Sequence, residues 1–288
     1  MQFDTIDSAT DAQGVCTVWL NRPEKHNALS AQMIDELTEM AANLRHSSAR
    51  VVVLAARGKS FCAGGDLQWM QAQMQADRAT RQEGARRLAG MLQSWNTLPQ
   101  PVIGRLHGNA FGGGVGLASI CDVAIGVENA WMGLTETKLG LIPATIGPYV
   151  IARMGEAAAR RVFMSARKFS AQEAQSLGLL AKTVAEDALD RAVTAEVTPY
   201  LSCAPGAVAA AKKTQAKVEK PVTLAIKVPG KPARETHKIS KNKKGEVIVD
   251  HTNRDKGTYD KINLTKKAGS KTIKQGVKAT KDWHKTNG

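Results

Sequence analysis

The sequence lacks several features that would assign it to a particular class of protein. It has no apolar run of about 18 residues, so we expect no membrane-spanning helix. Its first residues show no basic segment followed by an apolar one, so we expect no signal peptide. The four cysteines form no Cys-x-x-Cys motif and the six histidines show no zinc-binding spacing. We therefore expect a cytoplasmic protein with reduced thiols and without a metal.

Two familiar phosphate-binding motifs are also missing, although the chain has 25 glycines. A dinucleotide fingerprint that used Gly112 and Gly114 would need a glycine where Leu117 stands. Gly58-Lys59-Ser60 resembles the end of a phosphate loop, but the first glycine of that motif is replaced by Val53. Neither a nicotinamide dinucleotide nor a nucleoside triphosphate is therefore indicated.

Positive charge is distributed unevenly along the 288 residues. Residues 214–288 contain 19 Lys and Arg against 7 Asp and Glu, whereas residues 1–213 contain 21 against 19. This asymmetry predicts a domain boundary near residue 214. The basic segment is either a nucleic-acid or polyanion-binding element or a solvated, partly disordered extension, and its scarce aromatic residues favour the extension.

Strand and helix patterns alternate through the first part of the chain, which predicts an α/β fold. Ser30 and Ser170 stand where helix N-caps are expected, and Gly178 stands at a helix end. The expected strands are 15–20, 51–56, 101–106, 122–127 and 179–184, and the expected helices are 33–44, 88–98, 117–121 and 156–165. In the basic segment, 246–250 is expected to form a strand and 270–283 a weak helix.

The stretch 108–117 joins a buried strand to a buried helix through three consecutive glycines. Glycines leave the backbone N–H groups uncovered, and the start of a helix adds unpaired donors and a partial positive charge. Such a turn suits an anion, or an oxygen that becomes one during a reaction. The alternative is a turn that is tight only for packing.

Four stretches together resemble the crotonase superfamily of enoyl-CoA hydratases and isomerases. They are 21–29 (NRPEKHNAL), 61–67 (FCAGGDL), 107–117 (HGNAFGGGVGL) and 133–143 (GLTETKLGLIP). The resemblance covers about residues 3–213, and residues 214–288 do not follow the pattern. Residues 142–148 lack the usual glycine run, which makes the methylglutaconyl-CoA hydratase-like branch the most similar one. The resemblance implies a ββα spiral core, a trimer or hexamer, and a role in fatty acid or branched-chain amino acid breakdown.

The resemblance also implies roles for individual residues. The backbone N–H groups of Gly65 and Gly113 would hold the thioester oxygen of an acyl-CoA, and Glu136 would be the acid/base. No cofactor is implied apart from the coenzyme A of the substrate. The implied substrate-binding residues are Arg22, Lys25, His26, Ala28, Ala63, Gly64, Gly112 and Gly116. The charges of Arg22 and Lys25 are equally well explained as solvated loop residues.

One departure from the family pattern affects the expected chemistry. Family hydratases typically use two glutamates, and the first of them would stand where this chain has Gly116. A single carboxylate still moves a proton at the α- or γ-carbon while the enolate is held, but concerted addition of water would need another group, such as Thr135, Ser119 or an ordered water. Hydration of an α,β-unsaturated acyl-CoA is the expected reaction, with isomerisation as a variant. The alternative is a catalytically impaired acyl-CoA-binding protein with a polyanion-binding tail.

Overall fold

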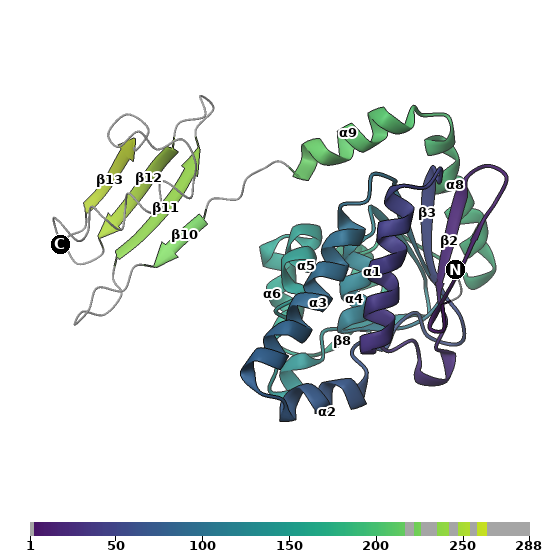
Figure 1. Ribbon diagram of the computed structural model, residues 1–288, viewed down its shortest axis with the longest axis horizontal. Coiled ribbons are helices and arrows are strands. Elements are labelled where there is room, and N and C mark those ends of the chain that lie inside the picture. The colour runs from purple at the N-terminus through teal and green to yellow at the C-terminus, as the bar shows by residue number, and fades with distance from the viewer. Residues whose placement is uncertain (1–2, 217–221, 226–234, 242–246, 254–257, 264–288) are drawn as a thin grey trace. The chain divides into compact units, whose positions relative to one another are not determined.

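The computed structural model describes residues 3–216, 222–225, 235–241, 247–253 and 258–263 (Figure 1). The chain forms two compact units, Met1–Lys213 and Thr214–Gly288. The change in composition at residue 214 falls at the same place. None of the described helices is long and apolar enough to cross a bilayer.

A six-stranded sheet in the order β1-β2-β3-β4-β6-β9 forms the centre of the first unit. Strand β1 is antiparallel to β2, and every later neighbour is parallel. The central strand β3 is buried on both faces, which explains its continuous run of apolar residues. The strands are β1 (Ile6–Thr10), β2 (Val15–Leu20), β3 (Val51–Ala56), β4 (Val102–Leu106), β6 (Val123–Val127) and β9 (Lys182–Val184).

Helices cover both faces of this sheet. On one side α1 (Ala31–Arg45) packs against α3 (Arg78–Asn96), and α3 packs against α4 (Gly113–Ile120) (Figure 1). The indole N–H of Trp95 in α3 donates to Leu37 O in α1 at 2.8 Å, so this large core residue leaves no buried donor unpaired. On the other side α8 (Leu189–Leu201) contacts β3, β4 and β6.

Smaller elements complete the first unit. A three-stranded sheet has the order β5-β7-β8, formed by Ala110–Phe111, Trp131–Gly133 and Lys168–Ser170. The remaining helices are α2 (Leu67–Gln75), α5 (Gly147–Met154), α6 (Glu156–Phe163), α7 (Ala171–Ser176) and α9 (Pro205–Ala216). Three short 3-10 helices cover Pro23–Lys25, Glu136–Leu139 and Glu186–Ala188.

The predicted caps are confirmed. Ser30 Oγ accepts from Met33 N at the start of α1, and Ser170 Oγ accepts from Glu173 N at the start of α7, both at 3.2 Å. Gly178 adopts φ +79° just after α7, a conformation that glycine reaches without strain. These local signals located helix ends because each acts within a few residues of the chain.

Several boundaries differ from the sequence expectations. Helix α4 begins at Gly113 and not at residue 117, so the glycines themselves form its first turn. Helix α3 begins at Arg78, where Asp77 caps it, and not at residue 88. Its first turns are polar and exposed, so they show no apolar periodicity. Strand β1 and helices α5 and α8 were not predicted.

The second unit contains four described strands in one antiparallel sheet, ordered β10-β11-β12-β13. They are Val222–Ala225, Glu235–Lys241, Val247–Asn253 and Thr258–Asn263. The strand expected at 246–250 is confirmed over residues 247–250, which belong to β12. The helix expected at 270–283 lies outside the described residues.

Candidate active site

The three loops with the family motifs follow three neighbouring parallel strands. Residues 21–30 follow β2, residues 57–66 follow β3, and residues 107–112 follow β4. Carboxyl ends of parallel strands lie at one edge of a sheet, where ligands of open α/β sheets usually bind. Motifs that are far apart in the sequence therefore meet at a single edge.

Asn27 holds the first of these loops to the second. Its side chain is fully buried. Its Oδ1 accepts from Arg22 N, and its Nδ2 donates to the carbonyls of Arg57 and Ser60, each at 2.8 Å. His26 and Asn27 adopt left-handed φ values of 49° and 54°, which few residues other than glycine and asparagine tolerate. The network stabilises a loop conformation that would otherwise be strained.

Glycines allow the second and third loops to approach at backbone distance. A Cβ on Gly108 would lie 2.5 Å from Lys59 O, and a Cβ on Gly114 would lie 2.4 Å from Cys62 O. Any side chain at either position would push the loops apart. The contact is completed by a hydrogen bond of 2.9 Å from Phe111 N to Cys62 O.

Gly65 and Gly113 each place a backbone N–H group at this contact. They are half-exposed, whereas Gly64, Gly112 and Gly114 are buried. Within the described part of the chain, neither the Gly65 N–H nor the Gly113 N–H has an acceptor. The two turns touch, because a Cβ on Gly64 would lie 3.6 Å from Gly113 N. The arrangement offers two free donors from adjacent turns.

The Glu136 carboxylate lies against the same two turns. A Cβ on Gly112 would lie 3.1 Å from Glu136 Oε1 and 3.8 Å from Gly64 Cα. A hydrogen bond of 2.8 Å from Gly112 N to Gly133 O links the glycine turn to the strand that leads to Glu136. Glu136 Oε2 is buried without a hydrogen-bond partner among the described residues. Burial raises the pKa of this carboxyl above its ordinary value, only partly offset by its own backbone N–H.

Gly116 does not face an open space. A Cβ there would lie 2.4 Å from Ile146 Cγ2 and 2.9 Å from Ile146 Cβ. Ile146 is almost fully buried at the start of α5, so it fills the space into which a longer side chain at position 116 would project. The absence of a glutamate at Gly116 is thus built into the packing of α4 against α5.

Arg22 has a partner within the protein. Its Nη1 donates to Asp66 Oδ2 at 3.1 Å and to Ala28 O at 2.7 Å, and both charged side chains are largely buried. The pKa of Asp66 is lowered below its ordinary value despite burial, because Trp69 N, Arg22 and Gln68 N all donate to the carboxylate. This pairing favours a structural role for Arg22 over the expected contact with coenzyme A.

The other expected substrate-binding residues lie on the first two loops. Lys25, His26 and Ala63 are exposed, and Lys25 forms no ion pair with any described residue. Ala63 N donates to His26 O at 2.9 Å, which joins the two loops. Ala28 is buried, with its N–H donated to Lys25 O. Lys25 is therefore the cation of this group that remains available to a ligand.

Two further residues, Cys62 and Asp122, lie close to the motif glycines in the sequence. Burial raises the pKa of the Cys62 thiol to about 12, so it is not a thiolate at neutral pH. Asp122 Oδ2 accepts from Val102 N at 2.8 Å and from Lys212 Nζ at 2.6 Å. Among the described residues, no three His, Cys, Asp or Glu side chains come together as a metal site would require.

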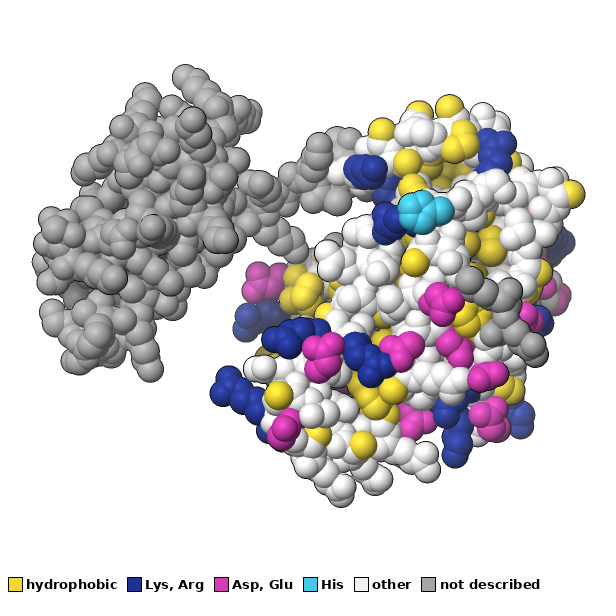
Figure 2. Space-filling view, viewed as in Figure 1, with side chains coloured by type: hydrophobic (Ala, Val, Ile, Leu, Met, Phe, Trp, Pro, Cys, Tyr) yellow, Lys and Arg dark blue, Asp and Glu magenta, His cyan; other side chains and the backbone are white. Residues whose placement is uncertain are grey.

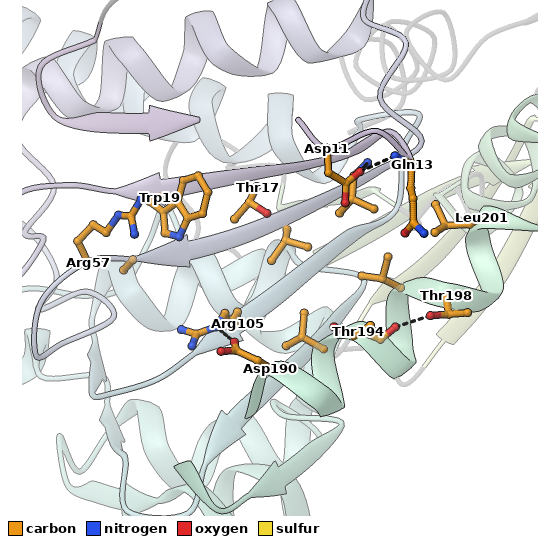
Figure 3. Close-up of a pocket in the computed structure, with 15 residues that line it drawn as sticks. Asp11, Gln13, Thr17, Trp19, Arg57, Arg105, Asp190, Thr194, Thr198 and Leu201 are labelled. Atoms are coloured by element: carbon orange, nitrogen blue, oxygen red, sulfur yellow. Dashed lines mark hydrogen bonds and ion pairs between the residues drawn. The ribbon is translucent and has the colours of Figure 1, made fainter. Parts of the chain in front are cut away.

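A cavity of about 490 Å³ lies elsewhere, between the sheet and α8 (Figure 3). It is lined by Thr17 and Trp19 of β2, by Val193 of α8 and by the Arg105–Asp190 ion pair. It contains none of the motif glycines and not Glu136. Figure 2 shows Lys, Arg, Asp and Glu intermingled on the visible face of the first unit, as expected from its near-neutral composition.

Sequence reasoning missed two residues that shape this site. Asn27 stood inside a recognised motif, and an asparagine between Pro23 and a predicted N-cap is a signal for a left-handed position. Ile146 gave no comparable signal, because its contact with Gly116 joins residues 30 positions apart.

Comparison with known proteins gives a consistent result. The family model for enoyl-CoA hydratase/isomerase matches residues 10–248, and so extends past residue 213. Enoyl-CoA hydratase AKT6-1 of Alternaria alternata is 36% identical over 179 residues, which are 61% of this chain and 58% of that protein. Enoyl-CoA hydratase domain-containing protein 2, mitochondrial, of Homo sapiens is 35% identical over 178 residues, 61% and 60% of the two chains. This chain thus spans less than two thirds of the length of these relatives.

Solved structures resemble the chain over a larger share of its length. An enoyl-CoA hydratase from Shewanella pealeana has a TM-score of 0.73 at 36% identity, covering 76% of this chain and 82% of that chain. An enoyl-CoA hydratase from Mycobacterium smegmatis has a TM-score of 0.72 at 34% identity, covering 76% and 85%. The crotonase-like α/β fold predicted for the first unit is confirmed. The chain belongs to the enoyl-CoA hydratase/isomerase family.

Proposed function

We propose that this protein hydrates or isomerises an α,β-unsaturated acyl-CoA through an enolate, with hydration as the first candidate. The observation that carries the proposal is the meeting of Glu136 with the two glycine turns. Glu136 Oε1 lies 3.1 Å from where a Cβ of Gly112 would stand, beside two backbone donors without acceptors among the described residues. The coenzyme A enters as part of the substrate, and no separate cofactor is proposed.

In this proposal the N–H groups of Gly65 and Gly113 form an oxyanion hole. They donate to the thioester oxygen, which gains negative charge as the enolate forms. Such preorganised donors typically contribute about 3–4 kcal/mol each to transition-state stabilisation. The donors belong to the main chain, so their positions depend on the close glycine contacts between the loops and not on a side-chain rotamer.

Glu136 would carry the proton. In hydration it takes a proton from water while the hydroxyl oxygen bonds to the β-carbon and the π electrons move to the thioester oxygen. The enolate then collapses and its α-carbon takes the proton back from Glu136. In isomerisation the same carboxylate moves a proton between two carbons. A raised pKa suits both steps, because the group then gives and takes a proton closer to neutral pH.

Position 116 offers no second carboxylate, since Ile146 fills the adjacent space. We therefore propose that Glu136 acts as the only carboxylate of the reaction. Lys25 is the proposed contact for the coenzyme A phosphates, with His26, Ala63, Gly64 and Gly112 lining the path of the thioester. The methylglutaconyl-CoA hydratase-like branch, a trimer or hexamer, and a polyanion-binding second unit stay predictions.

The test compares the wild-type chain with Glu136→Gln on a panel of enoyl-CoA esters. We expect hydration or isomerisation by the wild type and at least a 100-fold lower kcat in the variant, because a positioned acid/base typically contributes about 10²–10⁴-fold. Glu128→Gln is a matched control, because Glu128 follows β6 and is exposed. Binding of the esters without turnover by the wild type would favour the impaired acyl-CoA-binding protein. Full activity of Glu136→Gln would remove Glu136 from the mechanism.

A further inference from the structure

We infer that Arg22 and Asp66 are a positioning pair that fixes the Gly65 donor, an assignment that rests on the proposed function. The sequence offered Arg22 as a ligand of coenzyme A phosphates. Its surroundings indicate another role, because one guanidinium nitrogen donates both to Ala28 O in the first loop and to Asp66 Oδ2 directly after Gly65.

The Gly65 turn is held from both sides by a single residue of the first loop. Leu29 N donates to Gly64 O at 2.7 Å, and Asp66 N donates to Leu29 O at 3.0 Å. These bonds form an isolated parallel bridge between Leu29 and Gly65. Because both bonds use the residues that flank Gly65, the Gly65 N–H itself is left free.

Arg22 ties together the neighbours of this bridge. Its Nη1 donates to Ala28 O at 2.7 Å, next to Leu29, and to Asp66 Oδ2 at 3.1 Å, next to Gly65. Arg22 is itself fixed, because Asn27 Oδ1 accepts from its backbone N–H at 2.8 Å. The guanidinium thus connects the first loop to the residue that follows the oxyanion donor.

Asp66 is also the N-cap of helix α2. Its Oδ1 accepts from Gln68 N and Trp69 N, at 3.0 and 3.2 Å, and so caps α2 directly after the turn. The two side chains are 17% and 9% exposed, so solvent screens their interaction only weakly. Loss of either charge leaves the other one buried and unpaired, which favours movement of the loop.

Small movements of an oxyanion donor affect the chemical step. A displacement of about 1 Å costs about 100-fold in rate, and donors act only near their productive positions. Removal of the Arg22–Asp66 pair is therefore expected to lower kcat by about 10–100-fold. A phosphate-binding arginine would instead change KM for esters that carry the nucleotide phosphates.

The experiment measures kcat and KM of Arg22→Gln, Asp66→Asn and the double variant, with matched enoyl-CoA and enoyl-pantetheine thioesters. Asn is as good an N-cap as Asp, so Asp66→Asn removes the charge and keeps the cap of α2. Arg87→Gln is the control, because Arg87 pairs with Asp35 between α1 and α3 and is exposed. Thermal unfolding of each variant shows whether it is folded, and the assay is run well below its melting temperature.

We expect kcat to fall by the same factor with both thioesters, and KM to change by less than about 3-fold. The double variant should be no slower than the slower single variant, as for groups that act as a unit. Arg22→Lys, which keeps the charge, should recover part of the rate. A loss confined to KM for the CoA ester, or additive effects of the two variants, would overturn the pair as a positioning device. A wild type without turnover of either thioester would overturn the proposed function and this assignment together, whereas active variants with unchanged kcat would overturn this assignment alone.

Discussion

Replacement of Gly116 by alanine tests whether Ile146 really occupies the space beside it. The new methyl group would lie 2.4 Å from Ile146 Cγ2, a distance at which something must move. Overpacking of a core typically costs about 1–3 kcal/mol. Alanine in place of glycine inside a helix raises the free energy of unfolding by about 1 kcal/mol. The net change expected for Gly116→Ala is therefore a fall of about 0–2 kcal/mol in the free energy of unfolding.

Gly90 provides a matched control for this substitution. It also lies inside a helix, α3, but a Cβ there would have no neighbour within 4 Å. Gly90→Ala should therefore gain the helix propensity without the collision, and raise the free energy of unfolding by about 1 kcal/mol. Urea unfolding followed by tryptophan fluorescence measures both variants on the full chain.

A double-mutant cycle locates the collision at Ile146. Ile146→Ala alone should cost about 2–5 kcal/mol through the cavity that it leaves. Gly116→Ala should then be less harmful in the Ile146→Ala background, because the clashing Cγ2 is gone and the new methyl fills part of the cavity. If Gly116→Ala stabilises the wild type as much as Gly90→Ala does, position 116 is open and the argument for a single carboxylate fails.

Two further predictions concern Glu136 and Asn27. Burial raises the pKa of Glu136 in the folded state, so stability falls as pH rises from about the ordinary value of 4.5 through the raised pKa. Glu136→Gln has no such loss of stability, so its thermal midpoint should match or exceed that of the wild type at pH 7. This advantage should disappear below pH 4.5. A clearly lower midpoint of the variant at pH 7 would contradict the pKa argument. Asn27→Ala should lower the free energy of unfolding by about 3 kcal/mol, since it leaves buried partners unpaired. Asn27→Gly loses the same hydrogen bonds but tolerates φ 54°, so it should cost less, and equal losses would show that backbone strain contributes nothing.

Local signals account for the parts of the fold that could be predicted from the sequence. The β2 strand and the β3 strand have the predicted bounds, because their apolar runs end at polar loops. Ser30 and Ser170 were recognisable caps because a cap acts within three residues of itself. Helix α8 was missed, since its buried positions are few and its face toward the sheet includes threonines.

The motif glycines illustrate what a pattern alone leaves open. Gly108 and Gly114 are needed for packing, because a side chain at either would strike the backbone of the preceding loop. Gly65 and Gly113 are the half-exposed glycines whose N–H groups remain free within the described chain. The sequence left a packing turn and an anion-binding turn as alternatives. The structure shows the packing contacts, and the free N–H groups of Gly65 and Gly113 lie on the same turns. The close contacts bring the free donors together.

Charged residues were harder to interpret than glycines, and Arg22 shows why. A cation in a loop has the same sequence signature whether it contacts a phosphate or a carboxylate of the protein. The difference lies in Asp66, which is 44 positions away in the sequence. Once β2 and β3 pair in parallel, their following loops meet, and the two charges are buried together at 17% and 9% exposure. Burial at such low exposure is only tolerable for paired charges. The parallel pairing of β2 and β3 therefore brings Arg22 to Asp66, directly after the proposed oxyanion donor Gly65.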